Sequence, residues 1–145
     1  MAEIGFYHLT RTGLADALAP LLARTLQLKK RATVRCGTHE QLARLDQDLW
    51  VNPRHPWLPH GATEPMFQPV FLTTADERPN GADFLFLLDG MDTEDVAGCL
   101  RIFDLFDGRD APQVAAARTR WSRRKAEGHM LTYWRQADKG WEKAE

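Results

Sequence analysis

Five basic side chains crowd one short segment near the C-terminal end of the chain. Residues 118–125 read RTRWSRRK, so that four arginines and a lysine surround a single tryptophan, Trp121. Guanidinium groups bind carboxylates through paired hydrogen bonds, and a neighbouring indole adds an apolar surface. This combination suits an acidic peptide that ends in a hydrophobic residue and a free carboxylate.

The spacing of these residues indicates which of them can act together on a helix. Residues three, four and seven positions apart share one helix face, so Arg118, Trp121 and Lys125 fall on one stripe and Arg124 lies beside it. Arg118, Trp121, Arg124 and Lys125 are therefore the candidate residues for binding such a peptide. The alternative, which the pattern leaves open, is a solvated basic face with Trp121 turned inward.

A second pair of tryptophans brackets a proline-rich stretch. Residues 51–69 contain five prolines and one glycine, which predicts a long irregular loop, and Trp50 and Trp57 lie at its start and within it. Exposed aromatic residues on a rigid loop are typical anchors of protein interfaces. With Leu58 and Pro59 they form a candidate partner surface. The alternative is burial in the core, which we favour more for Trp50 than for Trp57.

Two Asp-Gly pairs are the strongest enzymatic candidates. Asp89 and Asp107 each follow an apolar run that is predicted to be a strand. Carboxylates at strand ends can hold a divalent ion for phosphoryl chemistry, whereas Asp-Gly also simply makes turns. The turn after the first strand has a single glycine and no P-loop ending, and the histidines lack metal-ligand spacing. We therefore predict no catalytic residue, metal or cofactor, and keep a metal-dependent phosphotransferase or hydrolase using Asp89 and Asp107 as the alternative.

Composition limits the remaining possibilities. A chain of 145 residues fits one domain, and a net charge of −1 excludes nucleic-acid binding by overall charge. Direct binding of single-stranded DNA by the basic helix would need several exposed aromatics, and only Trp121 is well placed. Cys36 and Cys99 are expected to be buried thiols. No secretory signal or apolar run of about 20 residues is present, so we expect a cytoplasmic protein without membrane contact.

Short apolar runs alternate with helical patterns, which predicts an α/β fold with a mostly parallel sheet flanked by helices. The expected strands are 4–9, 32–36, 70–73, 84–88 and 102–106. The expected helices are 14–26, with Pro20 kinking it or delaying its start, one beginning after Thr38, a short one near 94–99, and a last one from the Asp110 cap to Gly128. We expect one domain over 1–135 and a polar, frayed C-terminal tail over 136–145.

Short motifs along nearly the whole chain resemble, in order, those of the chi subunit of bacterial DNA polymerase III. They are Phe6-Tyr7, Glu40-Gln41, Leu49-Trp50, Pro59-His60, Asn80-Gly81-Ala82-Asp83, Leu88-Asp89-Gly90, Asp104-Leu105-Phe106-Asp107-Gly108, Ala116-Ala117-Arg118 through Trp121, Gly128-His129 and Leu131-Thr132-Tyr133-Trp134.

The resemblance implies a three-layer Rossmann-like domain that binds no nucleotide and is a non-catalytic accessory subunit in DNA replication. Chi proteins link the clamp loader, through the psi subunit, to the acidic C-terminal tail of single-stranded-DNA-binding protein, and so meet nucleic acid only indirectly. In the family this tail ends in a Pro-Phe carboxylate, and the tail-binding arginine and aromatic residue match Arg118 and Trp121. We therefore expect Arg118 to hold the terminal carboxylate, Trp121 to pack the last apolar side chain, and Arg124 and Lys125 to attract acidic residues of the tail. Ser122 stands where the family has a lysine, and Arg124 or Lys125 can substitute for it. Trp50 and Trp57 match the surface that binds psi or a helicase-like protein.

Overall fold

Two strands of this protein are buried on both faces, as expected for a sheet that is covered on both sides. In β3 (Val70–Thr73) and β4 (Phe84–Leu87) every residue is buried. Such continuous burial is typical of parallel strands that lie between two helical layers. The computed structural model describes residues 2–55, 57–138 and 140–144, and in these ranges seven strands form one sheet in the order β3-β2-β4-β5-β1-β6-β7.

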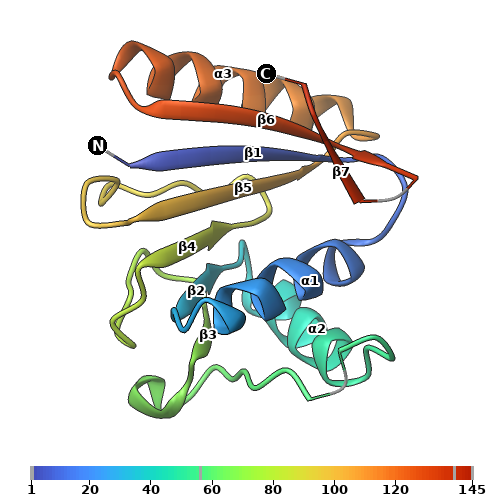
Figure 1. Ribbon diagram of the computed structural model, residues 1–145, viewed down its shortest axis with the longest axis vertical. Helices are drawn as coiled ribbons and strands as arrows, with labels where there is room; N and C mark the ends of the chain where they lie inside the picture. The colour runs from blue at the N-terminus through green and yellow to red at the C-terminus, as the bar shows by residue number, and fades with distance from the viewer. Residues whose placement is uncertain (1, 56, 139, 145) are drawn as a thin grey trace.

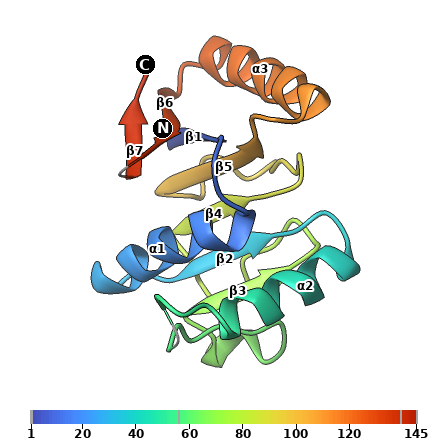
Figure 2. The same cartoon turned by 90° about the vertical axis from the view of Figure 1, so that its right-hand side faces the viewer.

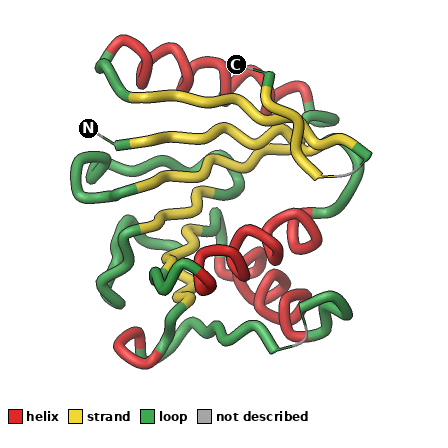
Figure 3. Tube along the Cα trace, viewed as in Figure 1, coloured by secondary structure: helices red, strands yellow, loops and turns green. Residues whose placement is uncertain are grey.

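Figure 1 shows this sheet as a twisted stack, and Figure 3 shows the same path coloured by secondary structure. Neighbouring strands run parallel, except for the antiparallel pair β6 and β7. The remaining strands are β1 (Glu3–Leu9), β2 (Ala32–Arg35), β5 (Arg101–Asp107), β6 (Met130–Ala137) and β7 (Gly140–Lys143). The helices are α1 (Leu14–Gln27), α2 (His39–Trp50), the 3₁₀ turn η1 (Pro65–Phe67) and α3 (Ala111–Ala126).

The helices cover the two faces of the sheet in separate layers. Leu18 of α1 and Leu49 of α2 belong to a large apolar cluster on one face, whereas Ala117 of α3 belongs to a second cluster with Phe6 and Phe106. Figure 2 shows α1 and α2 together and α3 apart from them, beside β6 and β1. The predicted three-layer α/β fold with a mostly parallel sheet is confirmed.

Local signals place the helix ends. The Thr38 hydroxyl accepts a hydrogen bond from the backbone N–H of Gln41 (3.1 Å) at the start of α2, which is the capping geometry that the sequence predicts. Gly128 follows α3 with φ +87°, a conformation that favours glycine. Asp110 occupies the N-cap position of α3, but its side chain makes no capping hydrogen bond. Helix α1 is helical from Leu14 onward, with Pro20 inside it, so proline does not delay its start.

Two sequence predictions are wrong. The described residues of the expected tail, 136–138 and 140–144, are not frayed. Strand β6 continues to Ala137, β7 pairs with it, and Trp141 packs edge-on against Tyr7 with ring centroids 5.0 Å apart. The short helix near 94–99 does not form. In its place are turns in which Gly98 N–H donates to the Asp95 carboxylate and Cys99 N–H to the Val96 carbonyl.

Candidate functional site

A cleft of about 270 Å³ opens between helix α3 and strand β6, on the face of the sheet away from α1 and α2. Arg118 and Trp121 line it from the helix, and Tyr133 and Arg135 line it from the strand. The other lining residues are Phe106, Val114, Ala117 and Ala144. The cleft therefore combines an apolar interior with an arginine on each wall.

Trp121 is half-buried, between the two positions that the sequence left open. Its ring packs edge-on against Phe6, with centroids 5.3 Å apart, and against Tyr133, at 5.9 Å. These contacts fix the indole on the core, while its remaining surface lines the cleft. Aromatic rings held in this way lose little conformational freedom when a ligand packs against them.

Both arginines of the cleft are available to a ligand. Arg118 and Arg135 are exposed, and neither forms an ion pair with an acid in the described ranges of the chain. Every second residue of a strand lies on the same face of the sheet, and on β6 this set includes Leu131, Tyr133 and Arg135. Their register partners on β1 are residues 4, 6 and 8. Arg135 was not predicted from the sequence, because its place in the cleft depends on the long-range pairing of β6 with β1.

His8 lies beneath the two arginines. Its Cα pairs with that of Arg135 in the sheet, and its Nδ1 lies 2.5 Å from the hydroxyl of Tyr133. Burial, followed by the positive charge of Arg135, lowers the pKa of His8, and Arg118 acts in the same direction whereas Asp107 opposes it. Both guanidinium groups line the same cleft, Arg118 from the helix and Arg135 from the strand.

The two other basic residues that were expected to attract a ligand, Lys125 and Arg124, differ in position. Lys125 is exposed one turn beyond Trp121, outside the cleft wall. Arg124 was expected to attract a ligand, but it is only 9 % exposed, and its guanidinium binds Asp92 at 2.7 Å and Glu127 at 2.9 Å. The structure therefore removes Arg124 from the candidate site, since its charge is already paired with the loop and the helix end.

Arg120 is likewise internal. Its guanidinium makes two hydrogen bonds to the buried carboxylate of Asp104, at 2.6 and 2.9 Å. Helical spacing separates Arg120 from the stripe of Arg118 and Trp121, but it does not show that the charge of Arg120 is buried and paired. The sheet position of Asp104, on the face that α3 covers, decides which arginine turns inward.

The residues of the second predicted surface differ in exposure. Trp57 is 89 % exposed, Trp50 is 47 % exposed, and Pro59 is also at the surface. Leu58, which was expected to contact a partner, is only 5 % exposed and belongs to the core cluster under α1 and α2. The Leu58 side chain anchors the loop to the core, so it is not available to a partner.

Comparison with known proteins gives the family of this molecule. Residues 1–132 match the family described as DNA polymerase III chi subunit, HolC. The chain belongs to this family. Its similarity to the "Probable DNA polymerase III subunit chi" of Rickettsia prowazekii (strain Madrid E) is 23% identity over 95 residues, which is 63% of this chain and 58% of that relative. Thus the match spans less than two thirds of the relative's length.

Chi is an accessory subunit of DNA polymerase III, and neither match indicates a catalytic family. In this chi-family chain the two candidate catalytic carboxylates serve local structure. The Asp89 carboxylate accepts the Gly37 backbone N–H at 3.0 Å, and that of Asp107 accepts two hydrogen bonds from Arg109, at 2.8 and 2.9 Å. Among the described residues, no cluster of three or more histidine, cysteine or acidic side chains is suited to a metal ion.

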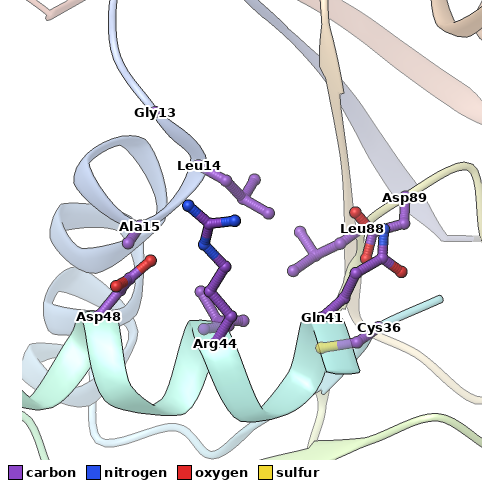
Figure 4. Close-up of a pocket in the computed structure, with 10 residues that line it drawn as sticks. Gly13, Leu14, Ala15, Cys36, Gln41, Arg44, Asp48, Leu88 and Asp89 are labelled. Atoms are coloured by element: carbon purple, nitrogen blue, oxygen red, sulfur yellow. The ribbon is translucent and has the colours of Figure 1, made fainter. Parts of the chain in front are cut away.

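A second cavity, of about 320 Å³, lies between the first turn of α1, helix α2 and the end of β4. Figure 4 shows Arg44 reaching from α2 toward Leu14, with Cys36 and Asp89 on the opposite side. Burial and the neighbouring Asp89 raise the pKa of Cys36 to about 12, so this thiol is protonated and unreactive.

Across the described ranges, no helix is both long and apolar enough to cross a bilayer.

Proposed function

We propose that this chi-family protein is a non-catalytic adaptor of DNA replication in the cytoplasm. Its cleft between α3 and β6 would bind the acidic C-terminal tail of single-stranded-DNA-binding protein, and a second surface would bind the psi subunit of the clamp loader or a helicase-like protein. The observation that carries this proposal is the pairing of exposed arginines with the apolar interior of one cleft.

The chemistry of the cleft fits the end of an acidic chain. The apolar lining takes the last hydrophobic side chain, which packs on Trp121 and Val114. Arg118 binds the terminal carboxylate through its planar fork of donors. Lys125, exposed one turn further along α3, attracts acidic residues upstream in the tail. Because Arg124 is paired internally, Lys125 alone stands in for the lysine that Ser122 replaces.

The second surface consists of Trp50, Trp57 and Pro59. Trp50 stacks on His60 with ring centroids 4.2 Å apart, and His60 is itself held by the carbonyls of Leu58 (2.8 Å) and Asp46 (3.1 Å). Part of this surface is therefore fixed before a partner arrives, which lowers the entropic cost of binding. The Trp57→Ala variant should lose capture of psi in a pull-down. The Met130→Ala variant, which changes an exposed apolar residue elsewhere, should keep it.

Calorimetric titration tests the tail site directly. An acidic peptide ending in Pro-Phe should bind with micromolar affinity, because ordering a flexible tail offsets much of the contact energy. Arg118→Ala should weaken binding at least tenfold, equal to about 1.4 kcal/mol.

A matched control uses another exposed arginine. Arg24→Ala lies on α1, on the opposite face of the sheet, and should leave the affinity unchanged. If Arg118→Ala binds the peptide as tightly as the unmodified protein, the tail site proposed here is wrong.

A further inference from the structure

Strand β6 supplies the cleft with a second arginine that the helix pattern does not contain. Arg135 lines the cleft opposite Arg118, is exposed, and pairs in register with His8 of β1. On the basis of the tail-binding function proposed above, we infer that Arg135 is a specificity residue that holds the terminal carboxylate of the ligand jointly with Arg118.

The position of His8 supports this joint role. His8 lies under the cleft, where its ring contacts Phe106 and Tyr133, with centroids 5.2 and 5.9 Å away. A side chain added at Gly108 would collide with the His8 ring, so glycine at this position leaves room for the histidine. Arg135 pairs with His8 in the sheet and lines the cleft from β6, and Arg118 lines the same cleft from α3, so two positive charges face one cavity from opposite walls.

Two cations on opposite walls of one cleft favour a particular ligand group. A carboxylate between two guanidinium groups can accept hydrogen bonds from both walls, whereas an amide carries no charge to be held there. The apolar lining then fixes the distance between this charge and the last side chain of the ligand. The cleft should therefore distinguish a free chain end from an internal acidic segment of the same composition.

An acidic residue next to Arg135 is expected to lower the affinity of the cleft for a carboxylate. Glu142 of β7 occupies the register position opposite Arg135, yet the two side chains form no ion pair within the described part of the chain. Like-signed repulsion between Glu142 and an incoming carboxylate should weaken binding modestly. Glu142→Gln is therefore expected to raise the affinity for an acidic chain end about twofold.

A double-mutant cycle between protein and peptide separates this inference from the proposed function. The titrated peptides are the acidic Pro-Phe peptide with a free C-terminus and the same peptide with a C-terminal amide. In the unmodified protein, amidation should weaken binding at least tenfold. In Arg135→Ala, amidation should weaken it less than threefold, because one of the two carboxylate partners is gone. Arg135→Lys should give an intermediate value.

The outcomes have distinct meanings. If amidation costs as much in Arg135→Ala as in the unmodified protein, Arg135 does not contact the carboxylate and the inference is overturned. The tail site itself would then still stand, provided that Arg118→Ala weakens binding. If the free peptide does not bind the unmodified protein at all, the proposed function fails. Circular dichroism and thermal unfolding of each variant confirm that the fold is retained, and Arg24→Ala again serves as the control.

Discussion

At the scale of single residues, two arginines of the same basic segment differ in role, since one is exposed and the other is buried. Arg118 is exposed beside the cleft, whereas Arg120, two positions later, is 7 % exposed and paired with Asp104. Burial raises the pKa of Asp104, and the hydrogen bonds from Arg120 oppose this effect. The pair therefore keeps α3 in a fixed orientation on the sheet, which in turn aims Arg118 and Trp121 at the cleft.

Removing Arg120 should destabilise the fold strongly. Arg120→Ala leaves the carboxylate of Asp104 buried without its partner, and we expect a loss of about 3–5 kcal/mol in the free energy of unfolding. Urea denaturation measures this loss. The matched control is Arg123→Ala, which removes a half-exposed ion pair with Asp92 on the same helix and should cost less than about 1 kcal/mol. Equal effects of the two variants would contradict this assignment.

The titration of His8 reports on the cleft. Arg135 of β6 and Arg118 of α3 lower its pKa together with burial, Asp107 of β5 raises it, and the Tyr133 hydroxyl contacts its ring. Because the folded protein disfavours the charged form, this histidine contributes stability above its ordinary pKa of about 6.5, and that contribution is lost as the pH falls below it.

NMR titration should therefore find the pKa of His8 below about 6.5 in the free protein. Saturation with the acidic peptide should raise this pKa, because the bound carboxylate opposes the two arginines. Arg135→Ala should raise it even without peptide. An unchanged pKa on peptide binding would place the ligand away from His8.

At the scale of elements, periodicity and turn signals located five of the strands and the three long helices. Strands β3 and β4 were predictable because continuous apolar runs bounded by turn residues have few other interpretations. Strand β6 was not predicted, because its residues are half-buried on both faces and give no clear alternation. Strand β7 was missed because its GWEK sequence is short and polar, and only Trp141 indicated a packed element.

The same reasoning explains how much of the candidate site could be predicted. Helical spacing identified Arg118 and Trp121, whereas Arg135 depends on the pairing of β6 with β1, a long-range contact that no local pattern encodes. The internal pairing of Arg124 depends on a loop 32 residues away in sequence. Local patterns therefore predicted the helical wall of the cleft and not the strand wall.

Trp141 tests whether β7 is part of the fold. Its ring contacts Tyr7 and packs against the core on the α1 face. Because the side chain is only partly buried, Trp141→Ala should destabilise the protein by about 1–3 kcal/mol, below the usual cost for a fully buried tryptophan. Thermal or urea unfolding measures this. Lys143→Ala on the same strand, at an exposed position, should change stability by less than about 0.5 kcal/mol.

At the scale of the whole molecule, the two candidate surfaces lie on different elements. The cleft belongs to α3 and β6, while Trp50 and Trp57 belong to the end of α2 and the loop that follows it (Figure 1). The two share no contact residue, so binding at one should leave the affinity of the other unchanged within about 0.5 kcal/mol. Titration of the peptide into free protein and into its complex with psi measures this coupling. Mutually exclusive binding would contradict the adaptor role.

The central claim, that an acidic chain end binds between α3 and β6, is tested most directly by mapping the peptide on the protein by NMR. On addition of the Pro-Phe peptide, the largest shift changes should fall on the Trp121 indole, the side chains of Arg118 and Arg135, and the Tyr133 backbone. Amidation of the peptide should diminish those changes. Shift changes centred on Trp50 and Trp57, or on the cavity around Arg44, would contradict the account.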